Sequence, residues 1–427
     1  LKIHYHNIQH TLEVTLGTTQ AVVQYFKEGS VKDVRLIILP IVAALFHDIG
    51  YSNREEIISF MQKLSLDEIV PLFSSAKDPS FLEDFKSRLE GILETNSLTG
   101  AEFHLHHVYL SQIFLPRILK GLPDTFIHKE YLLSKDSLEK INAIISLTDI
   151  KADPKRYREN RRQYLLEQDC LFLGESVATS DLLTQLATSD RLSKGPALYH
   201  EFFFGHDDKY WQSGLALMAT TTIFYESFAK KLIHVEVLSV LDKYFSSINF
   251  SNPYRTNLKL IFFLHKLFEP LYQKLLSSEP ITDQDMSILE GLEKNGLQKE
   301  IVDLFLATRT IRKGISLSNS LEKALYDLLK EKDSFLGVVL GDEVRITLMC
   351  GAALSQNSEK MIELLVLRKP ELLVERSLDL LKALQMIDSC DREKLLQGAL
   401  QVLESIPKDA PKLVTLKEAL LRMQSGA

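Results

Sequence analysis

The stretch LIILPIVAALFHDIG, residues 36–50, contains the longest apolar run of the chain and leads directly into an adjacent histidine and aspartate, His47 and Asp48. The apolar run, residues 36–46, is eleven residues long, and a helix needs about 20 residues to cross a bilayer. A run of this length with no polar face is typical of a helix buried in a protein core. We therefore predict a buried helix, with Pro40 inside it and the polar pair at its end.

Apolar residues elsewhere recur at spacings of three and four instead of alternating, which is the helical pattern. One stripe is formed by Ile8, Leu12 and Leu16, and two others lie in residues 108–118 and 141–147. Gly121 and Pro123 follow the second stripe as stop signals. The sequence has no hairpin signal and no run of β-branched strands. We predict an all-α fold, in which a helical bundle is followed by a second α-helical domain.

The length of 427 residues predicts more than one domain. A stretch rich in serine, asparagine and proline, residues 246–253, predicts a boundary between a first domain at 1–245 and a second at 254–427. Capping residues predict further helices in the second domain, and these residues are Ser320, Ser358, Asp391 and Pro411. That half has one histidine, His265, and no polar constellation, so we interpret it either as a helical packing domain or as an interaction module for a protein partner.

Composition restricts the function classes. Fifty basic and 57 acidic side chains give a net charge of −7, which does not favour binding to a nucleic-acid polymer. Three widely spaced cysteines exclude a disulfide framework and a Cys-x-x-Cys zinc site. No signal peptide or spanning segment is visible, so we expect a cytoplasmic protein without a membrane partner. The chain opens on Leu1 with no start methionine, and we expect residues upstream of it.

The 12 histidines are clustered in a way that predicts a metal site. His6 and His10 are four residues apart and share one helix face. His47 and Asp48 point about 100° apart on a helix, so they bind one ion only if it lies between them, or else Asp48 bridges two ions. Imidazole and carboxylate ligands suit one or two divalent ions of Zn, Mn, Fe, Ni or Mg.

Two motifs together resemble a known family. His-Asn-Ile-Gln-His-Thr at residues 6–11, followed by Phe-His-Asp-Ile-Gly-Tyr at 46–51, is similar to the HD superfamily of metal-dependent phosphohydrolases. Within it, the Tyr-His-Asn opening at residues 5–7 resembles the cyclic-nucleotide phosphodiesterase branch and its bacterial relatives. The resemblance covers residues 1–205. It implies a helical bundle that hydrolyses a small phosphorylated substrate, a nucleotide or cyclic-nucleotide-like phosphoester.

The resemblance also implies a ligand set. His10, His47 and Asp48 match the first three metal ligands. Three aspartates, Asp149, Asp169 and Asp190, are candidates for the last ligand. We favour Asp169, because aligning Leu-Gly at residues 173–174 with the family's Leu-Gly places it on the ligand. Asp149 then matches a position that lines the substrate site.

Further roles follow from the same match. His6 matches the proton donor to the leaving oxygen, and Asp48 would hold the water that a metal ion activates. His107, with Ser111 four residues later, matches a histidine that faces a second ion or the substrate phosphate. The substrate side would also include Tyr51, which stands where the phosphodiesterases carry a histidine. Val108 replaces a glutamate of the family.

The departures at Tyr51 and Val108 support an alternative function, a weakly active or inactive HD-fold protein with a regulatory or partner-binding role.

Two other sequence features bear on the predicted metal site. Residues 151–163 are locally basic. This segment is interpreted either as a surface that attracts an anionic substrate or as a solvated helix face. Cys170 is predicted to be a small buried residue and not a nucleophile, because no base is paired with it by spacing.

Overall fold

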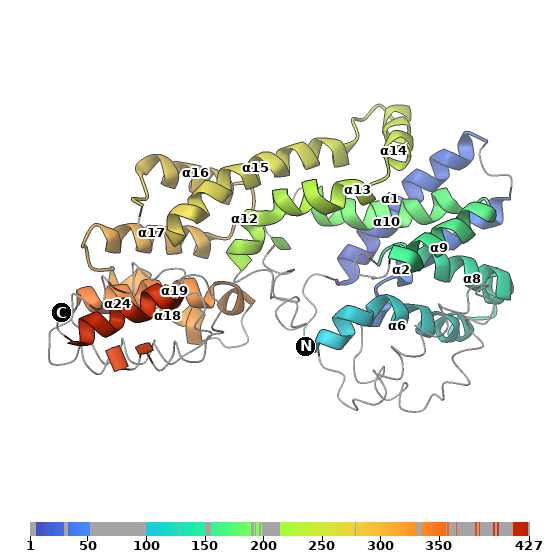
Figure 1. The fold of residues 1–427 in the computed structure, drawn as a ribbon. Coiled ribbons are helices and arrows are strands. Elements are labelled where there is room, and N and C mark those ends of the chain that lie inside the picture. Colours follow the sequence, from blue (N-terminus) through green and yellow to red (C-terminus); the bar gives the residue numbers. More distant parts are fainter. Residues whose placement is uncertain are drawn as a thin grey trace. The chain divides into compact units, whose positions relative to one another are not determined.

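The fold is all-α, as predicted, in a computed structural model of the chain (Figure 1). The structure describes residues 6–29, 33–51, 100–126, 128–149, 155–188, 214–277, 279–330, 335–355 and 413–425, together with a few isolated positions. The described segments contain helices, turns and connecting loops but no strand. The expectation of helices from the three- and four-residue apolar spacing is thereby confirmed.

The chain divides into two compact units, and the division is more complex than one boundary. Unit 1 comprises residues 1–189, 201–207 and 224–260, and unit 2 comprises 190–200, 208–223 and 261–427. The stretch that we predicted as a boundary, 246–253, lies inside unit 1, where it covers the end of one helix, the loop at 248–252 and Pro253, the first residue of the next helix. Asn252 accepts the Tyr254 backbone N–H and donates to Asp242, so the helix α15 (Pro253–Leu276) begins in unit 1 and continues into unit 2.

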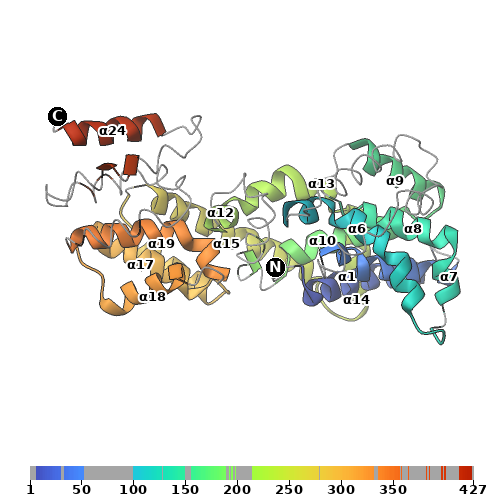
Figure 2. The same ribbon diagram turned by 90° about the horizontal axis from the view of Figure 1, so that it is seen from below.

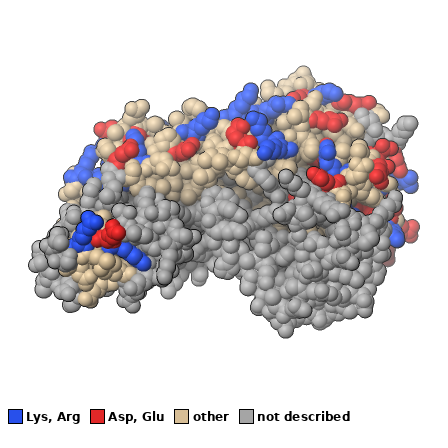
Figure 3. All heavy atoms as spheres, viewed as in Figure 1, with Lys and Arg blue, Asp and Glu red and all other residues tan. Residues whose placement is uncertain are grey.

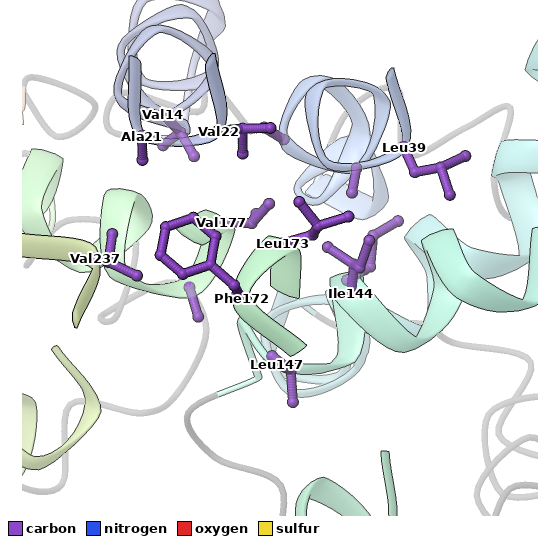
Figure 4. Close-up of a cluster of buried hydrophobic side chains, with 14 of the residues drawn as sticks. Val14, Ala21, Val22, Leu39, Ile144, Leu147, Phe172, Leu173, Val177 and Val237 are labelled. Carbon is purple, nitrogen blue, oxygen red and sulfur yellow. The ribbon is translucent and has the colours of Figure 1, made fainter. Parts of the chain in front are cut away.

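Unit 1 is built around α10 (Leu171–Leu186), which is buried along nearly its whole length. Helix α1 (Ile8–Lys27) packs along α10, and α2 (Ile38–Phe46) contacts both. Helices α8 (Lys135–Ser146) and α14 (Val235–Ser247) complete the core. Figure 4 shows how Val14, Leu39, Ile144, Val177 and Val237 bring these five helices together.

Helix α1 forms where predicted, but the stripe that indicated it faces outward. Ile8, Leu12 and Leu16 are all exposed. The buried face carries smaller and polar side chains, which are His10, Val14, Gly17, Thr18, Ala21 and Val22. The reason lies in the partner helix, because a Cβ on Gly17 would come within 3.1 Å of the Ser180 hydroxyl on α10. A close approach of two helices selects small residues at the contact.

The apolar run at 36–46 is buried in its middle, at residues 39–40 and 42–44, whereas Leu45 is exposed, and the run divides into two elements. A short 3-10 helix, η1 (Val34–Ile37), is capped by the Asp33 side chain and leads into α2. Pro40 is the third residue of α2, where the backbone N–H would have no partner inside the helix. Another 3-10 turn, η2 (Ile49–Tyr51), follows the His47–Asp48 pair.

The remaining described helices of unit 1 surround this core. They are α6 (Gly100–Gly121), α7 (Lys129–Leu133), α9 (Lys155–Glu167), and the short α13 (Lys230–Leu232) that follows the π-helical turn η5 (Tyr225–Ala229). Helix α6 lies over η2 and α8. Both views agree on the placement of α1 beside α10 and α14 (Figure 2).

Unit 2 contains the helix α12 (Gly214–Phe224) up to Ile223, the later part of α15, α16 (Asp283–Glu293), α17 (Lys299–Arg312), α18 (Asn319–Lys330), α19 (Phe335–Leu354) and α24 (Leu413–Ser425). Helix α18 begins one residue before the predicted cap Ser320. Positions Ser358, Asp391 and Pro411 lie outside the described residues. His265 is buried and its Nδ1 lies 2.6 Å from the Met218 carbonyl, so it takes part in packing.

No described helix is both long and apolar enough to span a membrane. Lysine, arginine, aspartate and glutamate alternate over the described surface in Figure 3, without a large field of one sign. This mixture is consistent with the small net charge and gives no support for a nucleic-acid-binding surface on that face.

Candidate metal centre

His10 enters the site from the first turn of α1. Asn7 is the N-cap residue, and its side-chain oxygen accepts the backbone N–H groups of Gln9 and His10 at 2.9 and 3.2 Å. This cap fixes where the helix starts and therefore which way His10 points. The imidazole is 2% exposed, which places it under the helix and against α10.

His47 and Asp48 enter from the end of α2. The helix ends at Phe46, so both residues lie in the turn that joins α2 to η2. Leaving the helix allows two adjacent side chains to face the same point, which a continuing helix would prevent. His47 is completely buried and Asp48 is 8% exposed.

The carboxylate that meets these residues is Asp181, which we did not predict. It lies near the end of α10 and is buried. Our favoured candidate Asp169 is wrong, because it is exposed, in the turn between α9 and α10, with a left-handed φ of 54°. No sequence signal marks Asp181, because its helix also carries Glu175 and several serines and threonines. Its burial, which requires a partner for the charge, is visible only in the fold.

The four side chains converge on one point. His10 Nε2 lies 3.2 Å from Asp181 Oδ1 and 3.4 Å from Asp48 Oδ2. His47 Nε2 lies 3.1 Å from Asp48 Oδ2 and 3.8 Å from Asp181 Oδ1. Ligand atoms of His10, His47 and Asp181 all lie within 4.8 Å of one another. We call His10, His47, Asp48 and Asp181 the metal centre.

Hydrogen bonds on the far side of each imidazole select the tautomer that a metal ion requires. His47 Nδ1 lies 2.8 Å from the Ala44 carbonyl, which can only accept, so Nδ1 carries the proton. Thr184 donates its hydroxyl to the Asp181 carbonyl, and its oxygen faces His10 Nδ1 at 3.4 Å. Both rings therefore present an Nε2 lone pair to the centre, as metal-binding histidines usually do.

The charges in the centre change the pKa values of its members. Burial by itself lowers the pKa of both histidines, but the Asp181 and Asp48 carboxylates outweigh it, so the pKa of His10 is raised and that of His47 is raised well above 6.5. Burial by itself raises the pKa of both aspartates, but the histidines outweigh it and lower both values. Two buried carboxylates therefore need positive charge between them, either protons on the histidines or a cation.

His6 and His107 lie on the other side of Asp48. The His6 ring is 5.3 Å from the His10 ring and 6.5 Å from the His107 ring, measured between centroids. His107 Nε2 is 3.8 Å from Asp48 Oδ1, the oxygen that does not face His10 and His47. His6, His10 and Asp48 form a second set of ligand atoms within 4.8 Å of one another. The structure thus brings together His6, His10, His47, Asp48 and His107, as predicted.

The structure describes only some of the other predicted positions. Asp149 is buried, three residues after the end of α8, and it belongs to neither of the two ligand-atom groups described above. Tyr51 lies in η2, but its side chain is outside the described residues, as are those of His104 and His106 on α6. Asp190 lies outside the described residues altogether. Val108, which replaces a glutamate of the family, is 1% exposed and packs in the hydrophobic core.

The described part of the basic segment, residues 155–163, lies in α9, and residues 151–154 lie outside the described residues. Arg162 binds Glu175 of α10 through Nε and Nη2, and His234 Nδ1 lies 3.2 Å from the same carboxylate oxygen. This arginine therefore ties α9 to α10. Cys170 is buried, and burial raises the pKa of its thiol to about 11, which agrees with a packing role and not with a nucleophile.

Comparison with known proteins identifies no relative: no protein-family model, curated protein or solved structure matches the chain. The case for a function therefore depends on the geometry of the site.

The metal centre fits a divalent ion on two grounds. His47 Nε2 and Asp48 Oδ2 are buried and lie 3.1 Å apart, so nitrogen and carboxylate ligand atoms are enclosed around a common point. The donor set of two imidazole nitrogens and two carboxylates is one that Zn, Mn, Fe and Ni ions accept.

Proposed function

We propose that this protein is a metal-dependent phosphohydrolase of the HD superfamily, acting on a small phosphorylated substrate such as a nucleotide. The observation that carries the proposal is the convergence of four side chains: His10 from α1, His47 and Asp48 from the turn after α2, and Asp181 from the more distant α10. A buried cluster of this composition is costly without an ion, since it holds two carboxylates in an apolar bundle.

The bound ion would supply Lewis acidity and lower the pKa of a water molecule toward neutrality. The chain itself supplies orientation. The Ala44 carbonyl and the Thr184 hydroxyl hold the two imidazoles with Nε2 toward the centre. Asp48 presents one oxygen to His10 and His47 and the other to His107, so it is the residue able to bridge two ions.

His6 is the proposed proton donor to the leaving oxygen. It precedes α1 and is only partly buried, whereas His10 is enclosed. A general acid must reach the substrate and still exchange protons with solvent, and this difference in exposure supports that division of roles. The set of His6, His10 and Asp48 also supports a second ion at this position, in which case His6 would be a ligand.

Metal analysis of the purified chain followed by a phosphoester assay tests the proposal. We expect about one or two equivalents of a divalent ion, and hydrolysis that depends on added Mn, Mg, Ni or Co. His47→Ala and Asp48→Asn should abolish both. Asp169→Asn is the matched control, since Asp169 is exposed in a turn. A chain that binds no ion, or hydrolysis that survives His47→Ala, would overturn the proposal.

A second candidate, a regulatory protein that binds metal or nucleotide without turnover, is favoured by one observation. Val108 is part of the hydrophobic core and cannot act where the family carries a glutamate. Stoichiometric metal with no hydrolysis across nucleotide, cyclic-nucleotide and simple phosphoester substrates would select this candidate. The helices of unit 2 would then be the place to seek a protein partner.

A further inference from the structure

A serine hydroxyl joins η2 to α6 beside the metal centre. The Gly50 backbone N–H donates to Ser111 Oγ at 2.9 Å, although 61 residues separate the two. Ser111 in turn donates its hydroxyl proton to the His107 carbonyl at 2.8 Å. Ser111 is completely buried, so no solvent competes for either hydrogen bond.

Gly50 makes this contact close. A Cβ at this position would lie 2.1 Å from the His107 carbonyl oxygen, a distance at which no side chain fits. The backbone of η2 therefore rests directly on the backbone of α6 at His107. Because Asp48 lies two residues before Gly50, one contact sets the positions of both Asp48 and His107.

We propose that Ser111 is a positioning residue that sets the distance between His107 and Asp48, and so assembles the side of the site that Asp48 Oδ1 faces. The inference rests on the proposed function for its effect on catalysis. Ser111 acts through His107, whose Nε2 is 3.8 Å from Asp48 Oδ1. Removing the hydroxyl would leave the buried Gly50 N–H without an acceptor, which favours movement of η2 away from α6.

A double-mutant cycle on the full chain separates positioning from general support. Displacement of a site residue by about 1 Å can cost up to about 100-fold in rate, and we expect Ser111→Ala to lower kcat/KM by about 10-fold. In a His107→Ala background, the same substitution should have less than about a twofold effect. Ser111→Thr, which keeps the hydroxyl, should restore most of the activity. Independent, multiplicative effects of the two substitutions would overturn the inference.

Two controls complete the experiment. Ser176→Ala removes another buried hydroxyl, which donates to the Phe172 carbonyl four residues earlier. Both residues lie on α10, so this hydrogen bond stays within one helix. The substitution should leave kcat/KM unchanged. Crystal structures of the metal-free wild type and Ser111→Ala form provide a readout besides activity. The separation of His107 Nε2 from Asp48 Oδ1 should increase, while His10 Nε2 stays close to Asp181.

These readouts distinguish the two proposals. If the wild type binds no metal and hydrolyses nothing, the proposed function fails, and the crystal comparison alone decides whether Ser111 positions His107. If the wild type is active but the His107–Asp48 separation is unchanged in Ser111→Ala, the positioning role fails and the proposed function stands.

Discussion

Asp181 Oδ1 lies 3.2 Å from His10 Nε2, the same nitrogen that lies 3.4 Å from Asp48 Oδ2. The contact joins the first turn of α1 to the end of α10, two helices that pack along each other. Asp181 and His10 are both buried, so their interaction is not weakened by solvent. The contact makes Asp181 the most informative residue to change.

Asp181→Asn should weaken metal binding by more than about 100-fold, since even substitutions outside the ligand shell cost about 10–100-fold. The amide keeps the shape of the side chain but removes the charge that an ion requires. Competition with a chromogenic chelator measures the affinity. Asp169→Asn should bind metal like the wild type, because asparagine also tolerates a positive φ. A lower metal affinity for Asp169→Asn than for Asp181→Asn would indicate that Asp169, and not Asp181, is the metal ligand.

Thr184→Val should reduce metal affinity by about 10-fold while the fold is retained. Valine has a similar shape, but it cannot face His10 Nδ1 with an acceptor oxygen, so the tautomer with a free Nε2 loses its support. Thr188→Val is the matched control, since its hydroxyl, two residues after the end of α10, donates to the Thr184 carbonyl and not to His10. Equal affinities for the two variants would exclude the orienting role of Thr184.

Metal uptake should strengthen as the pH rises from about 6 to 8.5. The pKa values of His10 and His47 are raised above 6.5, so without metal these rings keep their protons to a higher pH than a free imidazole, and an ion must displace these protons. Asp48 and Asp181, whose pKa values are lowered, remain ionised throughout this window. Calorimetry in buffers of different ionisation enthalpy should detect proton release on binding. Uptake that weakens with rising pH would contradict the assignment of these histidines.

The same shifts predict how the stability of the metal-free protein depends on pH. Groups with a raised pKa stabilise the fold below their unfolded value, and this contribution is lost as the pH rises through the folded value. His10 and His47 should therefore stabilise the metal-free protein below about pH 6.5. Added metal should raise the melting temperature most at alkaline pH. The measurement is the increase in melting temperature that metal produces at pH 6, compared with the increase at pH 8.5.

Gly50→Ala should destabilise the protein by about 2 kcal/mol through overpacking, and should impair metal-dependent activity more than stability alone explains. The added Cβ would collide with the His107 carbonyl and push η2 from α6. Gly121→Ala, at the end of the same helix α6, meets no atom within 4 Å and should be close to neutral. Urea denaturation and kcat/KM are the measurements. A Gly50→Ala protein with wild-type stability would show that the close contact is absent.

Arg312→Ala should destabilise unit 2 by about 2 kcal/mol without affecting metal content. Its guanidinium donates to four backbone carbonyls around the end of α15, those of Lys274, Leu275, Ser277 and Glu279. Arg312→Lys should not restore stability, because one ammonium group cannot span four carbonyls. Arg422→Ala, which removes an exposed pair with Glu418, is the neutral control. Loss of metal from Arg312→Ala would show that the two units do not fold independently.

The helical content was predictable because helix formation depends on the pattern of residues that are close together in the sequence. Three- and four-residue apolar spacing identified α1, α6 and α8, and an apolar run with a proline in its first turn identified α2. Periodicity alone did not give the buried face of α1. Ile8, Leu12 and Leu16 are the more hydrophobic residues, yet the close approach to α10 requires small ones, such as Gly17.

Three members of the metal centre were also predictable, because His10, His47 and Asp48 stand in short motifs that ligand chemistry restricts. The fourth was not, since Asp181 belongs to no motif that the sequence distinguishes from the turn residue Asp169. Only the packing of α10 against α1 and α2 selects it. The sequence by itself determined the helices and the ligand types, which depend on neighbouring residues. The tertiary structure decided which carboxylate joins the cluster, because burial against distant helices places Asp181 beside His10 and leaves Asp169 exposed to solvent.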